Sequence, residues 1–444
     1  MEFFGDYWVV TVLLLLFFIL TMYISINTIY YVFLSFFGFG EAKRDYELID
    51  DQTRFLILVA AHNEEKVIGS TLENLKKIQY RRDLYDIYVV NDNSTDRTGE
   101  ICDEHGIKHI DTAEKLFPRE GVGKPGGLQY ALRYLGYEKL TDKYDCLMIL
   151  DADNHVDPTI LKELNSQFIG KGKPEAIQSY LDSKNLTTNL SIGYAMSYYL
   201  TNRFFQLAKY RLGLPNAIGG TGFIVRLDYL LKHGGFRFKS LTEDLELEME
   251  IVKDNGRILW NHFVRIYDEK PDQLKISIKQ RTRWSQGHWY VAFTNLIPMV
   301  KKLLTEKGKM KILDQIFYLF GMAKAVQMFI ILFAVISVLG FKLFTFDFYD
   351  FPETSGKLAG LILGTSLFNL ILFVYQFCVC LLYAIKKDTN IKYRFLPMTF
   401  SSMYYAYTFI YAQIVGLLKW RQQHTWVKTE HNKTAIIKES NSRK

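Results

Sequence analysis

The feature that most constrains this chain is an apolar run of 32 residues, Trp8–Phe39, which contains no Asp, Glu, Lys or Arg. A helix needs about 20 apolar residues to cross the hydrocarbon core of a bilayer. A helix buried in a soluble protein would instead show a polar stripe along one side. Three more apolar runs follow late in the chain, at Leu313–Phe344, Leu358–Ile385 and Phe395–Leu418. We therefore expect a multi-pass membrane protein, and the pattern argues against a purely soluble or extracellular one.

Charges beside the apolar runs predict their orientation, because cytoplasmic segments of membrane proteins carry an excess of Lys and Arg. Two acids precede the first run, and Lys43 and Arg44 follow it, so this span should end in the cytoplasm. Three acids lie between the second and third runs, which suits the outside. Segments 386–394 and 419–444 carry formal charges of +3 and +5, against +7 for the whole chain. The positive charge therefore suits the cytoplasmic face of a cell membrane, and we expect no nucleic acid partner.

The fourth run decides where the tail lies, because three crossings after the central region would place the basic tail outside. This run is the least apolar, with two serines, Gln413 and several tyrosines. We interpret it as an interfacial or shallowly re-entrant segment, and the alternative is a true span with an external tail. The predicted organisation is an N-terminal transmembrane helix, a cytosolic domain with amphipathic interface helices, a transmembrane and interfacial region, and a basic cytosolic tail, at residues 1–40, 41–312, 313–418 and 419–444.

The central region, about 270 residues long, alternates apolar strands with helices. Phe55–Ala61, Ile87–Val90 and Cys146–Leu150 have the pattern of buried strands, and helices are expected over Glu65–Ile78 and Asp96–His105. Continuous apolar strands that alternate with helices predict a parallel α/β sheet. Ligands of such sheets bind at the carboxyl ends of the strands. The residues that follow each strand are therefore the first candidates for a functional site.

Asp151-Ala152-Asp153 directly follows the strand predicted at Cys146–Leu150. Two carboxylates so close together repel each other unless a cation lies between them or one is protonated. Mg²⁺ or Mn²⁺ takes oxygen ligands and leaves coordination positions open for a diphosphate. A bare D-x-D is common by chance, so the metal prediction depends on its position at the end of a strand.

Polar residues also follow the second strand, where Ser94, Thr95 and Asp96 could simply cap the next helix. Asp92 precedes that cap and is a better candidate for accepting a hydrogen bond from an N–H of a nucleobase. A glycine-rich segment with Lys124 opens a later helix and could bind phosphate there. The segment lacks the spacing of a Walker A loop, and a flexible surface loop would have the same composition.

Two further motifs lie on predicted helices. T-E-D at 242–244 begins a helix, where Thr242 as the N-cap followed by acids is ordinary helix-start chemistry. In Q-R-T-R-W at 280–284, the amide, the second guanidinium and the indole fall on one helical face. A guanidinium suits a phosphate group, and an indole offers a stacking platform for a pyranose ring. Near a membrane, the same basic helix could equally anchor to lipid.

Taken in order, Asp92 and the motifs at 151–153, 242–244 and 280–284 resemble those of the membrane-bound processive family 2 glycosyltransferases. That group includes cellulose, chitin and hyaluronan synthases and bacterial exopolysaccharide or capsule synthases. The resemblance covers about residues 54–290. It implies an α/β, Rossmann-like GT-A glycosyltransferase domain in the cytosol, with flanking transmembrane and interfacial helices. The implied reaction moves a sugar from a UDP-sugar with inversion at the anomeric carbon.

The resemblance also implies roles for single residues. Asp244, with Glu243 beside it, would be the catalytic base, and Trp284 would stack on the acceptor sugar. Asp151 and Asp153 would hold Mg²⁺ or Mn²⁺. Binding of the donor nucleotide falls to Glu64, Asp92, Lys124, Asp151, Gln280 and Arg283. A tail segment resembles a gating segment that closes over the nucleotide, although a tail bound to anionic lipid is the alternative; its residues are Trp426, Lys428 and Thr429.

Two features depart from the family pattern. Asn91 stands where many relatives have an additional Asp before Asp92, which leaves one carboxylate fewer at the base site. The membrane part is small, so secretion of a product would need a homo-oligomer or a secretion partner.

Three functions remain open at this stage. The leading one is synthesis of a β-linked exopolysaccharide or capsule polymer. The alternative within enzymes is the addition of a single sugar to a lipid-linked acceptor, as in a glycolipid synthase, and product length separates the two. A non-catalytic membrane scaffold or transporter is disfavoured, because the membrane runs hold few charges.

Overall fold

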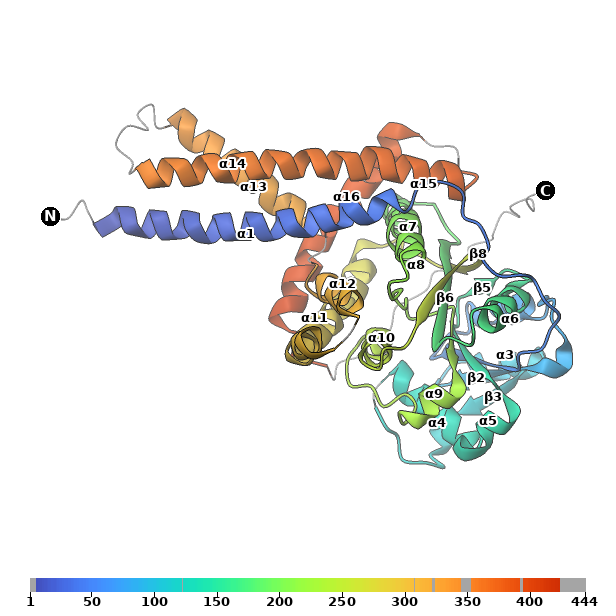
Figure 1. The fold of residues 1–444 in the computed structure, drawn as a ribbon. Coiled ribbons are helices and arrows are strands. Elements are labelled where there is room, and N and C mark those ends of the chain that lie inside the picture. The colour runs from blue at the N-terminus through green and yellow to red at the C-terminus, as the bar shows by residue number, and fades with distance from the viewer. Residues whose placement is uncertain are drawn as a thin grey trace.

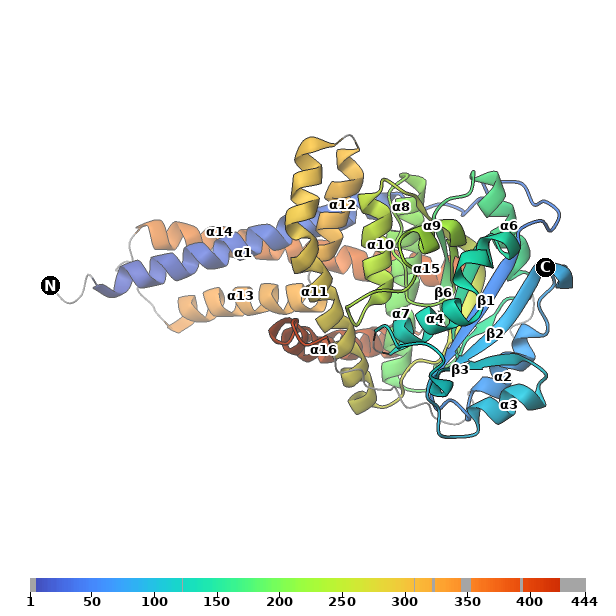
Figure 2. The ribbon, with the colours of Figure 1, turned by 90° about the horizontal axis from the view of Figure 1, so that it is seen from below.

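The computed structural model describes residues 5–121, 123–306, 308–321, 324–344, 353–391 and 394–423. Three long helices project side by side from an α/β domain (Figure 1; Figure 2). These helices are α1 (Gly5–Phe36), α13 (Lys324–Phe344) and α14 (Glu353–Val374). Further helices are α5 (Leu140–Lys143), α7 (Asn189–Thr201), α8 (Ala208–Arg211), α11 (Leu274–Thr305), α12 (Lys309–Phe320), α15 (Leu381–Asp388) and α16 (Phe395–Leu418). The predicted combination of an α/β domain with flanking apolar helices is confirmed.

Eight strands form one sheet in the order β3-β2-β1-β4-β7-β6-β8-β5. Their bounds are β1 Phe55–Ala61, β2 Tyr85–Asn91, β3 Lys108–Asp111, β4 Cys146–Asp151, β5 His155–Val156, β6 Ala176–Ser183, β7 Phe223–Arg226 and β8 Ile258–Asp268. Strands β3, β2, β1 and β4 run parallel, as predicted. However, β7 is antiparallel to both of its neighbours, and β5 is antiparallel to β8, so the sheet is mixed.

The reversed direction of β7 has a consequence for the site. Because β7 runs against β4, the beginning of β7 lies beside the carboxyl end of β4. The backbone N–H of Gly222 donates a hydrogen bond to the carbonyl of Ile149, with an N–O distance of 2.8 Å. The glycine-rich turn at 219–222 therefore lies next to the Asp151 end of β4. A fully parallel sheet would have placed this turn at the opposite edge.

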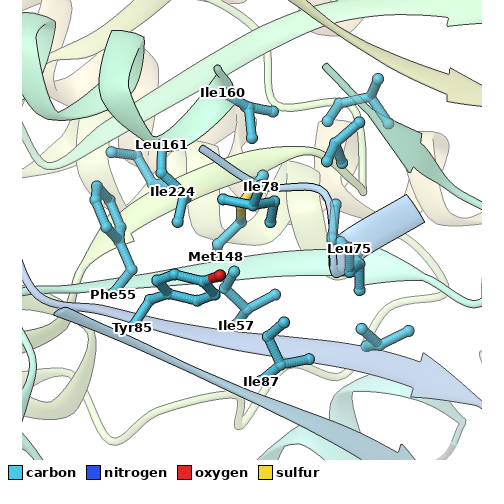
Figure 3. Close-up of a cluster of buried hydrophobic side chains, with 14 of the residues drawn as sticks. Phe55, Ile57, Leu75, Ile78, Tyr85, Ile87, Met148, Ile160, Leu161 and Ile224 are labelled. Carbon is cyan, nitrogen blue, oxygen red and sulfur yellow. The ribbon is translucent and has the colours of Figure 1, made fainter. Parts of the chain in front are cut away.

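Each face of the sheet is covered by helices, because successive side chains of a strand point to opposite faces. The first face packs against α2 (Ile68–Leu75), α3 (Thr98–Glu104) and α6 (Ile160–Gly170). Figure 3 shows part of this cluster, with Ile57 of β1, Met148 of β4 and Leu75 of α2. The second face packs against α4 (Lys124–Tyr134), α9 (Leu227–Lys232) and α10 (Glu243–Lys253). Burial of each large apolar side chain contributes roughly 1.5–3 kcal/mol, so these two layers hold the strand ends in place.

The second apolar run, Leu313–Phe344, forms two helices rather than one continuous span. Its first part belongs to α12, which lies against α11, and α13 begins at Lys324. The reason is Asp314, which is buried and pairs with the buried ammonium group of Lys209 in α8 at 2.8 Å. A charged pair formed with the α/β domain keeps α12 at that domain instead of in the hydrocarbon. The predicted boundary at 312 falls within α12, and the predicted domain division stays a prediction.

Two helices among the described residues are long and apolar enough to cross a bilayer, over Thr11–Phe36 and Ser355–Asp388. A shorter apolar helix covers Val326–Gly340. Side-chain hydrogen bonds join these helices, for example from Asn369 Nδ2 to Ser25 Oγ at 2.6 Å. Such polar contacts between apolar helices stabilise bundles in membranes.

The fourth apolar run, α16, packs along α7 and α11. Close approach occurs at Gly193 and Gly416, where an added Cβ would overlap Ser401 and Ser285. One side of α16 is thus held by the α/β domain. Its interfacial position in the membrane stays a prediction.

Buried cations of the α/β domain have their partners on the C-terminal helices. Arg203 forms two hydrogen bonds with the carboxylate of Asp388 at the end of α15, at 2.7 and 2.8 Å. Lys209 pairs with Asp314 of α12. Arg281 of α11 donates to a backbone carbonyl of α16 at 2.9 Å and to a threonine hydroxyl of α16 at 3.0 Å. All three cations are almost fully buried, so the domain and the helices form one folded unit.

Candidate active site

One cavity of about 900 Å³ lies at the carboxyl ends of β1 and β4, where the sequence predicts a ligand site. Ten of the thirteen residues singled out from the sequence line it, and they come from six separate segments. They are Glu64, Asp92, Lys124, Asp151, Asp153, Glu243, Asp244, Gln280, Arg283 and Trp284. The other three, Trp426, Lys428 and Thr429, lie outside the described residues, and the gating hypothesis stays a prediction.

Asp151 is the last residue of β4, and its backbone is fixed by side chains. Its N–H donates to Asn154 Oδ1 at 3.0 Å and to Thr221 Oγ1 at 3.1 Å. The ammonium group of Lys124 pairs with its carboxylate and also donates to the carbonyl of Gly220 at 2.7 Å. Burial alone would lower the pKa of Lys124, but the charges on Asp151 and Glu243 outweigh this effect and raise its pKa. Lys124 is therefore a fixed cation at the strand end.

Asp153 is buried, and one of its oxygens accepts a hydrogen bond from the backbone N–H of Glu269 at 3.0 Å. Its carboxylate and that of Asp151 both line the cavity. No cluster of three or more His, Cys, Asp or Glu side chains arranged to hold a metal occurs in the part of the chain that the structure describes. Asp151 and Asp153 would hold a metal ion through their carboxylate oxygens. This donor set fits Mg²⁺ or Mn²⁺.

Asp244 lies in the first turn of α10, where Oδ1 accepts a hydrogen bond from the backbone N–H of Leu245 at 2.9 Å. Its other oxygen lies above Gly220, which has a φ of +77° and where an added Cβ would be 3.1 Å away. Glycine is thus required here both by the close approach and by the backbone conformation. Burial and the neighbouring carboxylate of Glu243 raise the pKa of Asp244 to about 7. A carboxylate with this pKa can accept a proton near neutral pH.

The start of α10 is not held as the sequence predicts. Thr242 is at the N-cap position, but its side chain makes no capping hydrogen bond. Instead Glu246 Oε2 accepts hydrogen bonds from the backbone N–H groups of Lys239 and Ser240, at 2.7 and 3.0 Å. Thr242 packs against Gly287 of α11, where an added Cβ would lie 2.5 Å from the threonine hydroxyl. Packing by α11 thus takes the place of the expected cap.

The Q-R-T-R-W motif lies on α11, and the helical face that the sequence predicts to bind the ligand is turned toward the cavity. Gln280, Arg283 and Trp284 line the cavity, and Gln280 Oε1 accepts a hydrogen bond from Tyr194 at 3.2 Å. Arg281 points the other way, into α16. Burial lowers the pKa of Arg283, but an arginine stays charged under these conditions. The motif therefore brings one guanidinium into the cavity and uses the other to bind α16.

Asp92 follows β2, and its carboxylate already has partners. Arg119 forms a two-pronged ion pair with it, at 2.5 and 2.8 Å, and Thr112 donates to it at 2.7 Å. A nucleobase bound here would share the carboxylate with Arg119 or displace it. Asn91 does not line the cavity, and its amide donates to Asp111. Asn91, which stands where many relatives have an Asp, is thus used for a contact between neighbouring strands.

The sequence did not point to several residues that line the same cavity, namely Arg237, Lys239, Asp268, Glu269, His288 and Arg421. His288 could have been found, because it lies four residues after Trp284 on the same helical face. Asp268 and Glu269 follow β8, a strand with many polar residues that gave no strand signal. The other three lie in irregular segments, where the sequence carries no periodic pattern to place them.

A sheet whose D-x-D strand end, buried carboxylate and arginine-bearing helix meet in one cavity defines a glycosyltransferase of the GT-A type. Residues 53–287, just over half of the chain, match the family described as Glycosyltransferase like family 2, and the chain belongs to this family. In structure it is similar to the mannosyltransferase PcManGT from Pyrobaculum calidifontis, a structure in complex with GDP-Man and Mn²⁺. The TM-score is 0.53 at 16% identity, over 84% of this chain and 98% of that one, and shows a shared fold.

Three relatives show how the similarity is distributed along the chain. The Probable glycosyltransferase YdaM of Bacillus subtilis is 27% identical over 435 residues, covering 94% of this chain and 97% of that protein. The Beta-monoglucosyldiacylglycerol synthase of Nostoc sp. is 28% identical over 268 residues, covering 60% and 55%. The Poly-beta-1,6-N-acetyl-D-glucosamine synthase of Staphylococcus aureus is 23% identical over 282 residues, covering 64% and 66%. The chain therefore spans less than two thirds of the second and third relatives.

Proposed function

We propose that this glycosyltransferase moves a sugar from a UDP-sugar, with inversion, onto the end of a growing β-linked polysaccharide at the cytoplasmic face of the cell membrane. The observation that carries this proposal is the single cavity in which Asp244, Arg283 and Trp284 meet the Asp151 end of β4. The cavity thus brings together carboxylates and cations that suit a nucleotide diphosphate with a proton acceptor and an aromatic ring that suit a sugar.

Binding of the donor would use the cations that the fold places around the strand ends. Lys124 and Arg283, with Gln280 beside them, face the space in which the diphosphate would lie, and their charges stabilise the leaving group. Glu64 and Asp92 also line the cavity and are assigned to the nucleobase. Mg²⁺ or Mn²⁺ held by Asp151 and Asp153 would neutralise charge on the diphosphate oxygens.

Transfer requires one proton acceptor. Asp244 takes the proton from the acceptor hydroxyl while that oxygen forms a bond to the anomeric carbon of the donor sugar. The bond from this carbon to the diphosphate breaks, and its electron pair leaves with UDP. A single displacement inverts the configuration and needs no covalent intermediate with the enzyme. Burial and the charge of Glu243 keep the pKa of Asp244 high, and Trp284 stacks on the acceptor sugar.

A second candidate is the addition of one sugar to a lipid-linked acceptor. The relatives divide between the two functions, since one is named as a synthase of a polysaccharide and another as a synthase of a glucosylated diacylglycerol. The shared domain supports the chemistry of either. The small membrane region favours a single addition, unless a homo-oligomer or a secretion partner forms the path for a polymer.

The test uses the full chain in lipid nanodiscs, with UDP-glucose, UDP-N-acetylglucosamine and UDP-glucuronate as donors. Released UDP identifies the donor, and the mass of the product separates the two candidates. A ladder or a high-mass polymer supports the polysaccharide synthase, and one added sugar supports the glycolipid synthase. Release of UDP from none of the donors would contradict both.

Dependence on a metal can be tested with the same preparation. Because Asp151 and Asp153 lie close together at the strand end, chelation with EDTA should abolish UDP release. Added Mg²⁺ or Mn²⁺ should restore it. Full activity after thorough chelation would remove the metal from the proposal.

A further inference from the structure

His288 is a cavity residue to which the proposed function gives no role. It lies on α11 in line with Gln280 and Trp284, which are eight and four residues earlier, so the three side chains share one face. At 1.5 Å per residue, His288 is about 6 Å beyond Trp284 along the helix axis. Counted from Gln280, which is assigned to the diphosphate, His288 therefore lies beyond the residue proposed to stack on the acceptor sugar.

The hydrogen bond of the ring fixes its tautomer. Nε2 is 2.7 Å from the carbonyl oxygen of Leu319, in the last turn of α12. A carbonyl can only accept a hydrogen bond, so Nε2 carries the proton. Burial lowers the pKa of His288, so the imidazole is neutral at pH 7. A neutral imidazole has one N–H, and Nδ1 therefore presents a lone pair.

This lone pair has no partner among the residues that the structure describes. The bond to Leu319 is the one hydrogen bond that the ring makes with them, and Trp289 and Tyr318 contact the ring at right angles with centroids 5.9 Å away. The bond to Leu319 satisfies a carbonyl at a helix end, where no partner within the helix exists. One nitrogen of His288 is thus held by Leu319, and the other has no partner among the described residues, in a side chain that belongs to the lining of the cavity.

We propose that His288 is an acceptor-binding residue whose Nδ1 accepts a hydrogen bond from an acceptor hydroxyl other than the attacking one. This inference rests on the proposed function and names the class of acceptor. A saccharide has several hydroxyl groups, so one can attack while another donates to Nδ1. A diacylglycerol has a single hydroxyl, which the reaction consumes, and its ester oxygens cannot donate. The geometry at His288 therefore favours a saccharide acceptor that extends past Trp284.

Two substitutions distinguish the role of Nε2 from the role of Nδ1. In His288→Gln the carboxamide reaches the position of Nε2, so it can still donate to Leu319 but lacks the acceptor at Nδ1. In His288→Asn the carboxamide oxygen takes the position of Nδ1, and the bond to Leu319 is lost. The acceptor probes are a β-1,6-linked N-acetylglucosamine tetrasaccharide with UDP-N-acetylglucosamine and a diacylglycerol with UDP-glucose. Each variant is assayed for the KM of the acceptor and for UDP release without an acceptor.

We expect His288→Gln to raise the KM for the tetrasaccharide about tenfold or more, because one hydrogen bond to the acceptor is lost. UDP release without acceptor should stay at the wild-type rate, and His288→Asn should bind the tetrasaccharide nearly as well as the wild type. The matched control is His233, which lies outside the cavity and also bonds a backbone carbonyl, that of Tyr229, at 2.8 Å. His233→Gln and His233→Asn should leave both values unchanged.

Other results overturn the inference. If His288→Asn is impaired and His288→Gln is not, the residue acts only through Leu319. Equal values for the two variants would show that Nδ1 does not contact the acceptor. If the wild-type enzyme uses only the diacylglycerol as acceptor, the inference that the acceptor is a saccharide is wrong. A wild-type enzyme that releases no UDP from any donor would instead refute the proposed function itself, and this inference with it.

Discussion

Asp244 illustrates how position alone can prepare a carboxylate for acid–base chemistry. The side chain is half-buried in the cavity, close to the glycine turn at Gly220 and next to Glu243. Burial and the charge of Glu243 favour the protonated form, while the ammonium group of Lys124 favours the ionised form. The balance leaves a pKa at which the group can both take up and release a proton near neutral pH.

Asp244→Asn should separate catalysis from binding. The asparagine side chain has the same size, and its oxygen can still accept the hydrogen bond from the backbone N–H of Leu245. It cannot accept the proton of the acceptor hydroxyl, so turnover should fall by roughly 10²–10⁴. The affinity for UDP, measured by calorimetry, should stay close to that of the wild type. Glu250→Gln, on the same helix but outside the cavity, is the matched control and should leave turnover unchanged. Loss of UDP binding in Asp244→Asn would show that the residue serves the donor instead.

The pH dependence follows from the direction of the same shift. Because the pKa of Asp244 is raised to about 7, the group is mostly protonated below that pH and ionised above it. A base acts only when ionised, and kcat/KM reports the pKa of the free enzyme, so kcat/KM should fall about tenfold per pH unit below pH 7 and level off above pH 8. The measurement is kcat/KM between pH 5.5 and 9, with the residual rate of Asp244→Asn as the control. A rate that stays constant from pH 8 down to pH 5.5 would argue against this assignment.

Contacts between helices decide where Asp244 lies, and Gly287 tests them. An added methyl group would overlap Thr242 at the start of α10, so Gly287→Ala should displace that turn. Overpacking of this kind costs about 1–3 kcal/mol, and we expect a lower melting temperature together with a lower turnover. Gly360→Ala on α14 is the matched control, because nothing lies within 4 Å of its added Cβ. Equal melting temperatures for the two variants would show that α11 can move away from α10 at little cost.

The elements that could be predicted from sequence are those whose pattern is local. Strands β1, β2 and β4 are short buried apolar runs followed by polar residues, and the structure has all three at or near the predicted bounds. Strand β8 was not predicted, because it carries polar residues such as Arg265, whose ion pair with Asp182 exists only in the folded sheet. The division of the second apolar run likewise depends on Asp314 meeting Lys209, which are 105 positions apart.

In the candidate site too, some residues could be predicted from local sequence patterns and others could not. Its acidic motifs could be found because each follows a strand or begins a helix, and the Q-R-T-R-W motif because its spacing defines one helical face. The partners of these residues could not be found. Arg119 reaches Asp92 from an irregular loop, and the polar surroundings of Asp153 come from Glu269, more than a hundred residues away. Such contacts depend on tertiary structure and leave no periodic trace in the sequence.

At the scale of the whole molecule, the orientation across the membrane is open to a direct test. Lys139 lies exposed on the α/β domain, and Lys357 lies exposed in the first turns of α14, beside the acidic stretch expected outside. In a Cys378→Ser background, Lys139→Cys should resist impermeant thiol reagents in intact cells, and Lys357→Cys should react. The other three cysteines are buried and should contribute little. Labelling of Lys139→Cys in intact cells would place the α/β domain outside and reverse the predicted topology.

The buried cations of the α/β domain limit how the enzyme can be produced. The segment that matches the family ends at residue 287, yet the carboxylate partners of Arg203 and Lys209 and the groups on α16 that bind Arg281 lie beyond it. A water-soluble fragment trimmed to the matched segment would lack these partners and the helices that cover the three cations. Apolar side chains of the α/β domain that pack against these helices, such as Met196 and Tyr180, would become exposed as well, and exposed apolar surface favours aggregation. Expression of the catalytic part alone should therefore yield insoluble material, so biochemical work needs the intact chain in detergent or lipid.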